Sequence, residues 1–348
     1  MKILHINFSF TQGGIDNMMR DIMAVQMKNG HQISLLIIND HIETEVLEAL
    51  PNGVDIYRIN RPKGSRNIYY IIKVLYYINL VIRPDVVHCH HGDIGKYIAL
   101  DTHKKILTVH AMGLPTKHYH YFNHICCISE AVKKNVLQTY PTEKISVIYN
   151  GIDFSLIKRR ETQNGIRKIV VVGRLNHDDK GQDIAIKGLK KSISEGGLYS
   201  LDIVGNGKSM DFLKRLIVKH KVESYIQMLG ARNREWLYKH LCEYDLMIVP
   251  SRHEGFGLTI LEGIAANLPV IASDIDGPKE ILCNGKYGFL FKSEDPNDLA
   301  NKIKAVASMQ NLQLCKKIDE DYKYMKANFS IEITSLKYIQ LYQTLITR

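Results

Sequence analysis

The feature that most constrains the fold is a strand–helix–strand unit at the start of the chain. Lys2–Phe8 and Gln32–Ile38 are short apolar runs, and Ile15–Lys28 between them carries apolar residues at helical spacing. Two strands that are joined through a helix must lie parallel, because the connection is a crossover and not a hairpin. The same alternation recurs through the second half of the chain. We therefore predict an α/β fold with parallel sheets.

A polar, charged stretch divides the alternation into two series. Lys158–Arg167 reads KRRETQNGIR and separates a strand at Ile145–Ile148 from another at Lys168–Val172. With 348 residues, the chain is long enough for two domains. We predict two Rossmann-like, doubly wound domains, 1–157 and 158–330, that face a cleft. We expect residues 331–348 to form a helix that packs back on the first domain.

The composition favours anionic partners. The formal net charge is +10, with 45% hydrophobic residues, which indicates a globular chain that attracts phosphorylated ligands, anionic lipid or nucleic acid. The sequence lacks recognised nucleic-acid motifs, so no such partner is expected. No signal peptide is evident, and the apolar run Ile68–Ile82 is shorter than the roughly 20 residues that cross a bilayer. We expect a cytoplasmic protein.

The most informative segment is Pro250–Ser273, PSRHEGFGLTILEGIAANLPVIAS. A strand precedes it and a helix begins near its centre, which would leave unpaired amide donors that suit a phosphate. These donors belong to Gly257, Leu258 and Thr259. Glu254 precedes the helix and Glu262 lies one turn inside it. Because carboxylates repel phosphate, we expect both to accept hydrogen bonds from sugar hydroxyls.

A second segment places two cations at the end of a strand. Val170–Gln182 reads VVVGRLNHDDKGQ, with Arg174 directly after the strand and Lys180 before the next helix. Arginine can bind phosphate oxygens bidentately, and lysine acts as a mobile point charge. The pair therefore suits a diphosphate.

Together these segments resemble the signature of the family 4 retaining glycosyltransferases, which have the two-domain GT-B fold. The resemblance extends over nearly the whole chain and is strongest between residues 170 and 290. It implies that Arg174 and Lys180 neutralise the leaving nucleoside diphosphate. It also implies that Glu254 is catalytic and orients the sugar, and that Glu262 holds the ribose. Two further donor-binding residues follow from the same resemblance: Gly205, in the Val204-Gly205-Asn206-Gly207 turn, and Arg232, near the base.

The resemblance assigns three further residues in the first half. Gly13 and Gly14 match the glycine-rich loop that closes over the diphosphate in relatives. His110, at the end of a predicted strand, matches the family histidine that faces the donor sugar, and it is the second catalytic candidate. Asp16 departs from the pattern, because relatives usually carry Glu near this position, and its role is left open.

The function that these residues imply is transfer of a hexose or modified hexose, with retention, from a nucleotide sugar to a hydroxyl. We expect a UDP-sugar ahead of a GDP-sugar, no cofactor and no metal. The expected acceptor is a glycan, lipid-linked, in polysaccharide or lipopolysaccharide assembly. Alternatives are a sugar-nucleotide epimerase of the same fold and a non-catalytic anionic-ligand-binding protein. A dinucleotide-dependent oxidoreductase is excluded, because no Gly-x-Gly-x-x-Gly fingerprint is present.

Three segments admit a second interpretation. His88–His91 (HCHH) could ligate a metal, or belong to an acceptor-side loop. Asp274–Asp276 looks like the Asp-x-Asp metal motif of another transferase fold, but it follows a strand here and we interpret it as a loop. Arg61–Arg83 combines five cations with tyrosines and aliphatic residues. That segment could lie on an anionic membrane surface, or it could be a core helix with a basic end.

Overall fold

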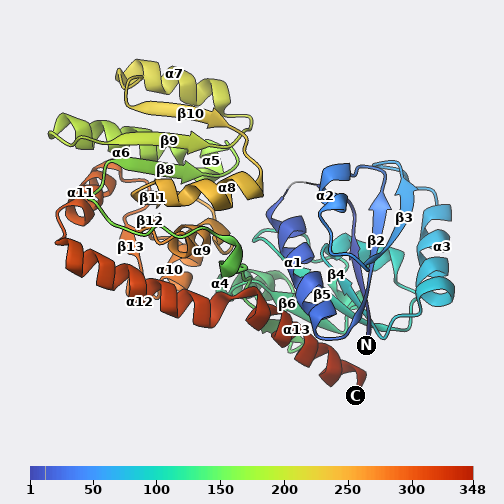
Figure 1. Ribbon diagram of the computed structural model, residues 1–348. Helices are drawn as coiled ribbons and strands as arrows, with labels where there is room; N and C mark the ends of the chain where they lie inside the picture. The colour runs from blue at the N-terminus through green and yellow to red at the C-terminus, as the bar shows by residue number, and fades with distance from the viewer. Residues whose placement is uncertain (12, 348) are drawn as a thin grey trace. The chain divides into compact units, whose positions relative to one another are not determined.

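The computed structural model describes residues 1–11 and 13–347, and it divides into two compact units (Figure 1). Unit 1 comprises residues 1–151 together with 331–348, and unit 2 comprises residues 152–330. Each unit is built on its own parallel β-sheet with helices beside it. The predicted fold class, two Rossmann-like α/β domains, is confirmed.

Unit 1 contains a seven-stranded sheet of order β3-β2-β1-β4-β5-β6-β7, in which every pair is parallel. The order reverses direction between β1 and β4, and loops at the carboxyl ends of these central strands are where such sheets bind ligands. The strands are β1 Lys2–Asn7, β2 Gln32–Asn39, β3 Asp55–Arg61, β4 Val86–Cys89, β5 Lys104–Val109, β6 His124–Cys127 and β7 Ile145–Val147.

The helices of unit 1 follow these strands in the sequence. Ser129 caps the start of α4, because its hydroxyl accepts a hydrogen bond from the Val132 amide at 3.1 Å. The helical elements are α1 Gly14–Lys28, α2 Thr44–Glu48, α3 Tyr69–Tyr76, the π-helix η1 Tyr77–Ile82, the 3-10 turns η2 Gly92–Tyr97 and η3 Tyr119–Tyr121, α4 Glu130–Thr139 and α13 Ile331–Ile346.

The chain returns to unit 1 through α13, which packs beside α1. Tyr338 and Tyr342 of α13 are fully buried in the core that Met19, Ile22 and Met23 of α1 help to form. Large aromatic side chains bury much apolar area, so the last helix is a structural part of the first unit.

Unit 2 contains a six-stranded parallel sheet of order β10-β9-β8-β11-β12-β13. Its strands are β8 Lys168–Val172, β9 Ser200–Val204, β10 Ile226–Gly230, β11 Leu246–Val249, β12 Val270–Ser273 and β13 Phe289–Phe291. Its helical elements are η4 Phe154–Leu156, α5 His177–Lys180, α6 Gln182–Ser194, α7 Met210–His220, α8 Arg234–His240, η5 Leu241–Glu243, α9 Leu258–Ala265, α10 Asp276–Ile281, α11 Pro296–Ala307 and α12 Asn311–Phe329.

The division between the units falls at 151/152, ahead of the predicted position at 157/158. Ile152 forms a β-bridge with Ser330, and the Phe154 ring lies against Tyr322 of α12 at 5.6 Å. Residues 152–157 therefore already belong to the second unit. Such tertiary pairings leave no local signal, whereas the composition shift at Lys158–Arg167 is visible in the sequence.

The loop predicted at Asp274–Asp276 is confirmed for its first two residues. Asp274 and Ile275 lie in the loop after β12, and Asp276 is the first residue of α10. Asp274 accepts a hydrogen bond from the Ser293 amide at 2.8 Å and lies 3.8 Å from the Lys279 ammonium. Because Pro278 sits in the first turn of α10, where a missing amide hydrogen costs nothing, the residues after β12 can start a helix at once.

The Arg61–Arg83 segment has buried and exposed apolar side chains, so part of it is a core helix and its membrane contact stays a prediction. Val74, Ile78 and Ile82 are buried, whereas Ile72 and Leu80 are 60% and 59% exposed. The segment has four further exposed apolar side chains, at the N-cap residue of α3 and along α3 and η1: Ile68, Tyr69, Tyr76 and Val81. Two of the five cations are engaged internally. Arg61 is buried and donates to Asn39, and Lys73 donates to the Ile59 carbonyl. In the described part of the chain, no helix has both the length and the apolar character that a membrane crossing needs.

Candidate active site

The strand-end loops of unit 2 are tied to one another through their backbones. Gly173 and Leu175 donate to the carbonyls of Val204 and Asn206, at 3.0 and 2.9 Å. A Cβ on Gly205 would lie 1.9 Å from the Gly173 oxygen, so only glycine allows the two loops to approach this closely. Buried Leu175 anchors the loop, and the neighbouring Arg174 is exposed at the end of β8. Gly205 therefore has a clear packing role, and its contact with donor remains a prediction.

Lys180 and Glu254 meet although 74 residues separate them in the sequence. The Lys180 Nζ atom lies 2.5 Å from Glu254 Oε2, and the two side chains are 24% and 16% exposed. Lys180 ends α5, and Glu254 lies in the loop between β11 and α9. The structure thus joins the two predicted donor-binding segments at one charged pair.

Gly181 holds these segments close together. Its φ is +63°, and a Cβ would lie 1.9 Å from the carbonyl oxygen of Pro250. The conformation and the space both require glycine here. The Lys180-Gly181 pair of the motif thus has two tasks: Gly181 permits the approach of the loops, and Lys180 presents the charge.

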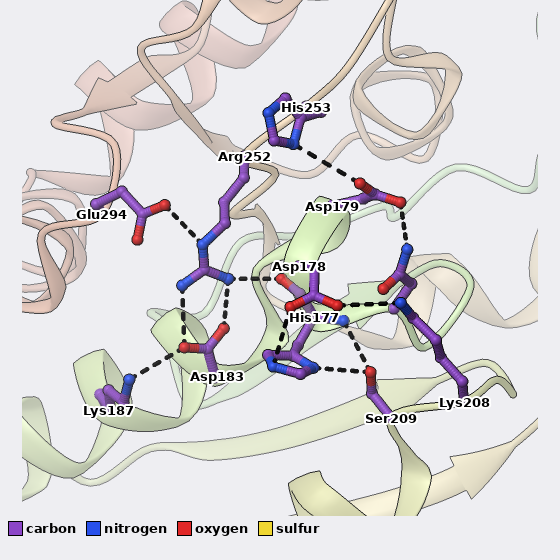
Figure 2. A network of polar contacts seen from close by, with 11 residues as sticks. His177, Asp178, Asp179, Asp183, Lys187, Lys208, Ser209, Arg252, His253 and Glu294 are labelled. Carbon is purple, nitrogen blue, oxygen red and sulfur yellow. Dashed lines mark hydrogen bonds and ion pairs between the residues drawn. The ribbon is translucent and has the colours of Figure 1, made fainter.

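Arg252 fastens the same loop to α5 and α6 (Figure 2). Its guanidinium bonds both carboxylate oxygens of Asp183, at 2.6 and 3.0 Å, and also Glu294 at 2.6 Å and the His177 carbonyl at 2.5 Å. The hydrogen bonds to Asp183 raise the pKa of Arg252. Burial opposes ionisation of Asp183, but the bonds from Arg252 and Lys187 outweigh it and lower the pKa of this carboxyl. Both groups are therefore charged at neutral pH, and such bidentate pairs are rigid.

The start of α9 offers backbone donors near Glu254. Gly257 is the N-cap residue, with φ +113°, and no side chain caps this end among the described residues. A Cβ on Gly257 would lie 3.5 Å from Glu254 Cγ, which places the helix start beside the carboxylate. The first helical residues, Leu258 and Thr259, are half-buried. An uncapped helix N-terminus carries partial positive charge that suits a phosphate.

Glu262 lies inside α9, at a different place from the Lys180 pair. The Tyr238 hydroxyl of α8 donates to Glu262 Oε1 at 3.5 Å, and the Arg234 guanidinium lies 4.7 Å from the centre of the Tyr238 ring. Arg232 is exposed, and its guanidinium lies 5.3 Å from the centre of the Trp236 ring. An exposed arginine beside an indole can stack against a planar ring, and the contact of Arg232 with the base stays a prediction.

In unit 1, the glycine-rich loop leads directly into α1. Gly13 is the N-cap residue and Gly14 the first helical residue, while Gln12 lies outside the described residues. Asp16 is buried and accepts hydrogen bonds from the Asn7 side chain at 3.0 Å and the Thr11 amide at 3.1 Å. Burial raises the pKa of Asp16 to about 6, and the hydrogen bonds to Thr11 and Asn7 oppose that shift. Asp16 thus ties the loop to β1.

His110 is the last, half-buried member of a row of imidazoles whose other two members, His5 and His90, are buried. His90 Nδ1 lies 3.2 Å from His110 Nε2, His90 Nε2 lies 3.1 Å from His5 Nδ1, and His5 Nε2 lies 2.8 Å from Gln26 Oε1. Burial lowers the pKa of His5 to about 4 and that of His110 to about 3, and it lowers the pKa of His90 well below the usual value. All three rings are neutral at neutral pH.

The metal interpretation of His88–His91 has a geometric basis, but hydrogen bonds already engage the nitrogens. The nitrogens of His5, His88 and His90 lie within 4.8 Å of one another. However, His88 Nδ1 is 2.6 Å from the Tyr342 hydroxyl, and Nε2 is 2.7 Å from the Thr108 hydroxyl. A metal ligand needs a free lone pair, so the donor set suits a hydrogen-bonded core better than a cation.

The structure brings together Lys180, Glu254 and Gly257 in unit 2, and Gly205 packs against Gly173 and Leu175, the two neighbours of Arg174 in the sequence. Glu262 and Arg232 lie around α8 instead, and Gly13, Gly14 and His110 belong to unit 1. Sequence reasoning missed Arg252 and Asp183, because a pair 69 residues apart leaves no spacing signal. It also missed His5 and Gln26, whose partners lie on other elements.

Comparison of the sequence with known protein families identifies the class of protein. Residues 154–324 match the model of the glycosyl transferases group 1, and residues 12–156 match that of Glycosyltransferase Family 4. Two glycosyltransferase domains thus account for most of the chain, which is a glycosyltransferase.

Individual related proteins match the chain across both of its units. The chain is 28% identical to an uncharacterized glycosyltransferase of Methanocaldococcus jannaschii, over 84% of this chain and 86% of that protein. It is 23% identical to a subunit of the phosphatidylinositol N-acetylglucosaminyltransferase of Saccharomyces cerevisiae, over 78% of this chain and 67% of that subunit. The solved structure of Anabaena HepE in complex with UDP and glucose has a TM-score of 0.80 and 20% identity, covering 99% and 100% of the two chains. This last likeness supports the GT-B fold.

Proposed function

We propose that the chain transfers a hexose or modified hexose from a nucleoside-diphosphate sugar to a hydroxyl group, with retention of configuration. The observation that carries the proposal is the Lys180–Glu254 pair beside the uncapped start of α9. Cations and amide donors are combined with a carboxylate in one place. This combination suits a ligand that carries both phosphate oxygens and sugar hydroxyls.

In the proposed reaction, Arg174, Lys180 and the amides at Gly257, Leu258 and Thr259 stabilise the charge that grows on the departing diphosphate. Glu254 accepts hydrogen bonds from the sugar, and Glu262 from the ribose. Arg232 lies along the base, and Gly13, Gly14 and His110 serve the diphosphate and sugar as the resemblance implies. Neither a metal nor a cofactor is part of this proposal. The preferred donor is a UDP-sugar, which the bound UDP of the HepE structure supports.

The acceptor that we propose is a lipid-linked glycan at the inner face of the membrane, in polysaccharide or lipopolysaccharide assembly. The exposed apolar side of α3 and η1 supports peripheral attachment, with Ile72 and Leu80 entering the interface and Lys63, Arg66 and Arg83 meeting anionic headgroups. A relative that is named for phosphatidylinositol is consistent with a lipid acceptor. Vesicles with phosphatidylglycerol should bind the protein, and Ile72→Asp with Leu80→Asp should abolish binding without lowering the Tm.

Thermal shift against UDP-, GDP-, ADP- and dTDP-sugars tests the donor. A ligand at a hundred times its Kd adds about 2.7 kcal/mol to stability. One nucleotide series should raise the Tm, and Lys180→Ala should remove that rise. Lys187→Ala is the matched control, because Lys187 also pairs with a carboxylate, that of Asp183, but lies on α6. Stabilisation by none of them would remove the proposed donor site, and formation of a new sugar nucleotide without acceptor would indicate an epimerase.

A further inference from the structure

The hydrogen bonds along the row of imidazoles in unit 1 all run in one direction, which is set by Gln26 at the start of the row. Gln26 of α1 is fully buried, and its amide faces two different groups. The oxygen Oε1 lies 2.8 Å from His5 Nε2, and the nitrogen Nε2 donates to the Tyr342 hydroxyl at 3.4 Å. An amide oxygen can only accept, so His5 must carry its proton on Nε2.

Each following ring then has one allowed tautomer. A neutral imidazole that is protonated on Nε2 accepts through Nδ1, so His90 Nε2 donates to His5 Nδ1 at 3.1 Å. By the same rule, His110 Nε2 donates to His90 Nδ1 at 3.2 Å. The neutral state on which this rule depends follows from burial, which lowers the pKa of each ring.

The far end of the row is an acceptor without a partner. His110 Nδ1 is buried and, within the described residues, has no hydrogen-bond partner. An unpaired buried polar atom costs stability, so its presence needs an explanation. A ligand group that donates a hydrogen bond would provide one.

We propose that Gln26, His5 and His90 are positioning residues that fix His110 as the Nε2-protonated tautomer, so that Nδ1 accepts a hydrogen bond from a ligand hydroxyl. The fold sets the relay: β1, β4 and β5 are neighbours in the sheet, and His5, His90 and His110 lie on or directly after these strands. Only the identity of the hydroxyl, a donor-sugar hydroxyl, rests on the proposed function.

A second hydrogen-bonded row starts from the same amide and provides a control. Gln26 Nε2 donates to Tyr342, whose hydroxyl lies 2.6 Å from His88 Nδ1. The row continues from His88 through Thr108 to the buried Tyr338 hydroxyl at 2.9 Å. Tyr338→Phe removes the end of this second row and leaves the first untouched.

The test is the ring-nitrogen NMR spectrum of the protein with 15N-labelled histidine, in which a His110→Gln variant identifies the His110 signals. The wild-type protein should show His110 protonated at Nε2 and unprotonated at Nδ1. Gln26→Met removes the acceptor and should give a mixture of both tautomers. His90→Phe, which breaks the row in the middle, should do the same, and Tyr338→Phe should not change the spectrum.

Two results would overturn the proposal: protonation of wild-type His110 at Nδ1, or one unchanged tautomer in both Gln26→Met and His90→Phe. Shifts of the His5 and His90 signals on adding one equivalent of Zn²⁺ would overturn it as well, because a ligating nitrogen cannot take part in the row. The spectrum needs no donor, so it can fail independently of the proposed function. With the sugar nucleotide that stabilises the protein, Gln26→Met should lower kcat about tenfold, the effect of one lost hydrogen bond, and change KM little.

Discussion

The two units hold their polar clusters in opposite ways. In unit 2, Lys180 with Glu254 and Arg252 with Asp183 are paired opposite charges near the surface. In unit 1, His5, His90 and His110 form a neutral row that is removed from water. In a charged pair the roles of donor and acceptor follow from the charges, whereas in a neutral row they depend on which ring nitrogen carries the proton. The cluster of unit 2 therefore suits the binding of charged groups, whereas the row of unit 1 fixes which ring nitrogens donate and which accept hydrogen bonds.

The largest expected effect is a difference between the two units in how much stability they lose at low pH. The pKa values of His5, His88, His90 and His110 are lowered on folding, so between about pH 6.5 and about 4 the unfolded state binds more protons than the folded state. Stability should fall as the pH falls, by about 1.4 kcal/mol per pH unit for each histidine. Asp16, with its pKa raised to about 6, opposes this by one proton.

The measurement uses the single tryptophan, Trp236, which lies in unit 2. At pH 5, circular dichroism in urea should show loss of structure before the tryptophan fluorescence changes. The lowered pKa of Asp183 means that its contribution in unit 2 is lost only as the pH falls below about 4. Coincident transitions at pH 5 and at pH 7.5, with equal midpoints, would contradict the neutral-row description of unit 1.

The next effect tests how tightly the charged cluster is assembled. Gly181→Ala must place a Cβ against the Pro250 carbonyl and adopt a positive φ, and we expect a loss of about 3 kcal/mol of stability. Gly196→Ala is the matched control: its φ is also positive, but the space around it is open, so about 1 kcal/mol should be lost. Denaturant unfolding measures both. Equal losses would mean that the loops are not closely packed.

Removing one charge of the Lys180 pair should reduce activity and preserve the fold. Glu254→Gln keeps an oxygen that can accept from Lys180, but it loses the carboxylate, and we expect kcat to fall on the order of a hundredfold. Glu294→Gln changes an exposed carboxylate that touches Arg252 and should change kcat less than about threefold. Near-normal transfer by a folded Glu254→Gln protein would remove Glu254 from the site.

The smallest expected effect concerns the hydrogen bond between Tyr238 of α8 and Glu262 of α9. Tyr238→Phe deletes the hydroxyl that donates to Glu262 at 3.5 Å, a long hydrogen bond. We expect KM for the donor to change by about threefold, with kcat unchanged, because such a bond contributes at most about 0.5–1 kcal/mol. A fall in kcat without a change in KM would place Glu262 nearer to the reacting atoms than the proposal does.

Most secondary-structure elements were predictable because their signals are local. Apolar runs located the strands, as at Lys168–Val172, and apolar residues at helical spacing located α1. The short elements α2, α5, α10 and β13 were not predicted, since a few residues carry too little periodicity. In the same way, the glycines of the Lys180-Gly181 and Glu254–Gly257 segments marked the loops but did not reveal which loop each one meets.

The sequence by itself determined the fold class, the two series of strands and the segments that carry the chemistry, because each depends on neighbours within a few residues. Only the tertiary structure decided which side chains meet. The sheet order sets β1 beside β4 and β4 beside β5, and this adjacency makes a row of His5, His90 and His110. The approach of Gly181 to Pro250 likewise joins Lys180 to Glu254. Such pairings depend on chain crossovers of many residues, and no local pattern encodes them.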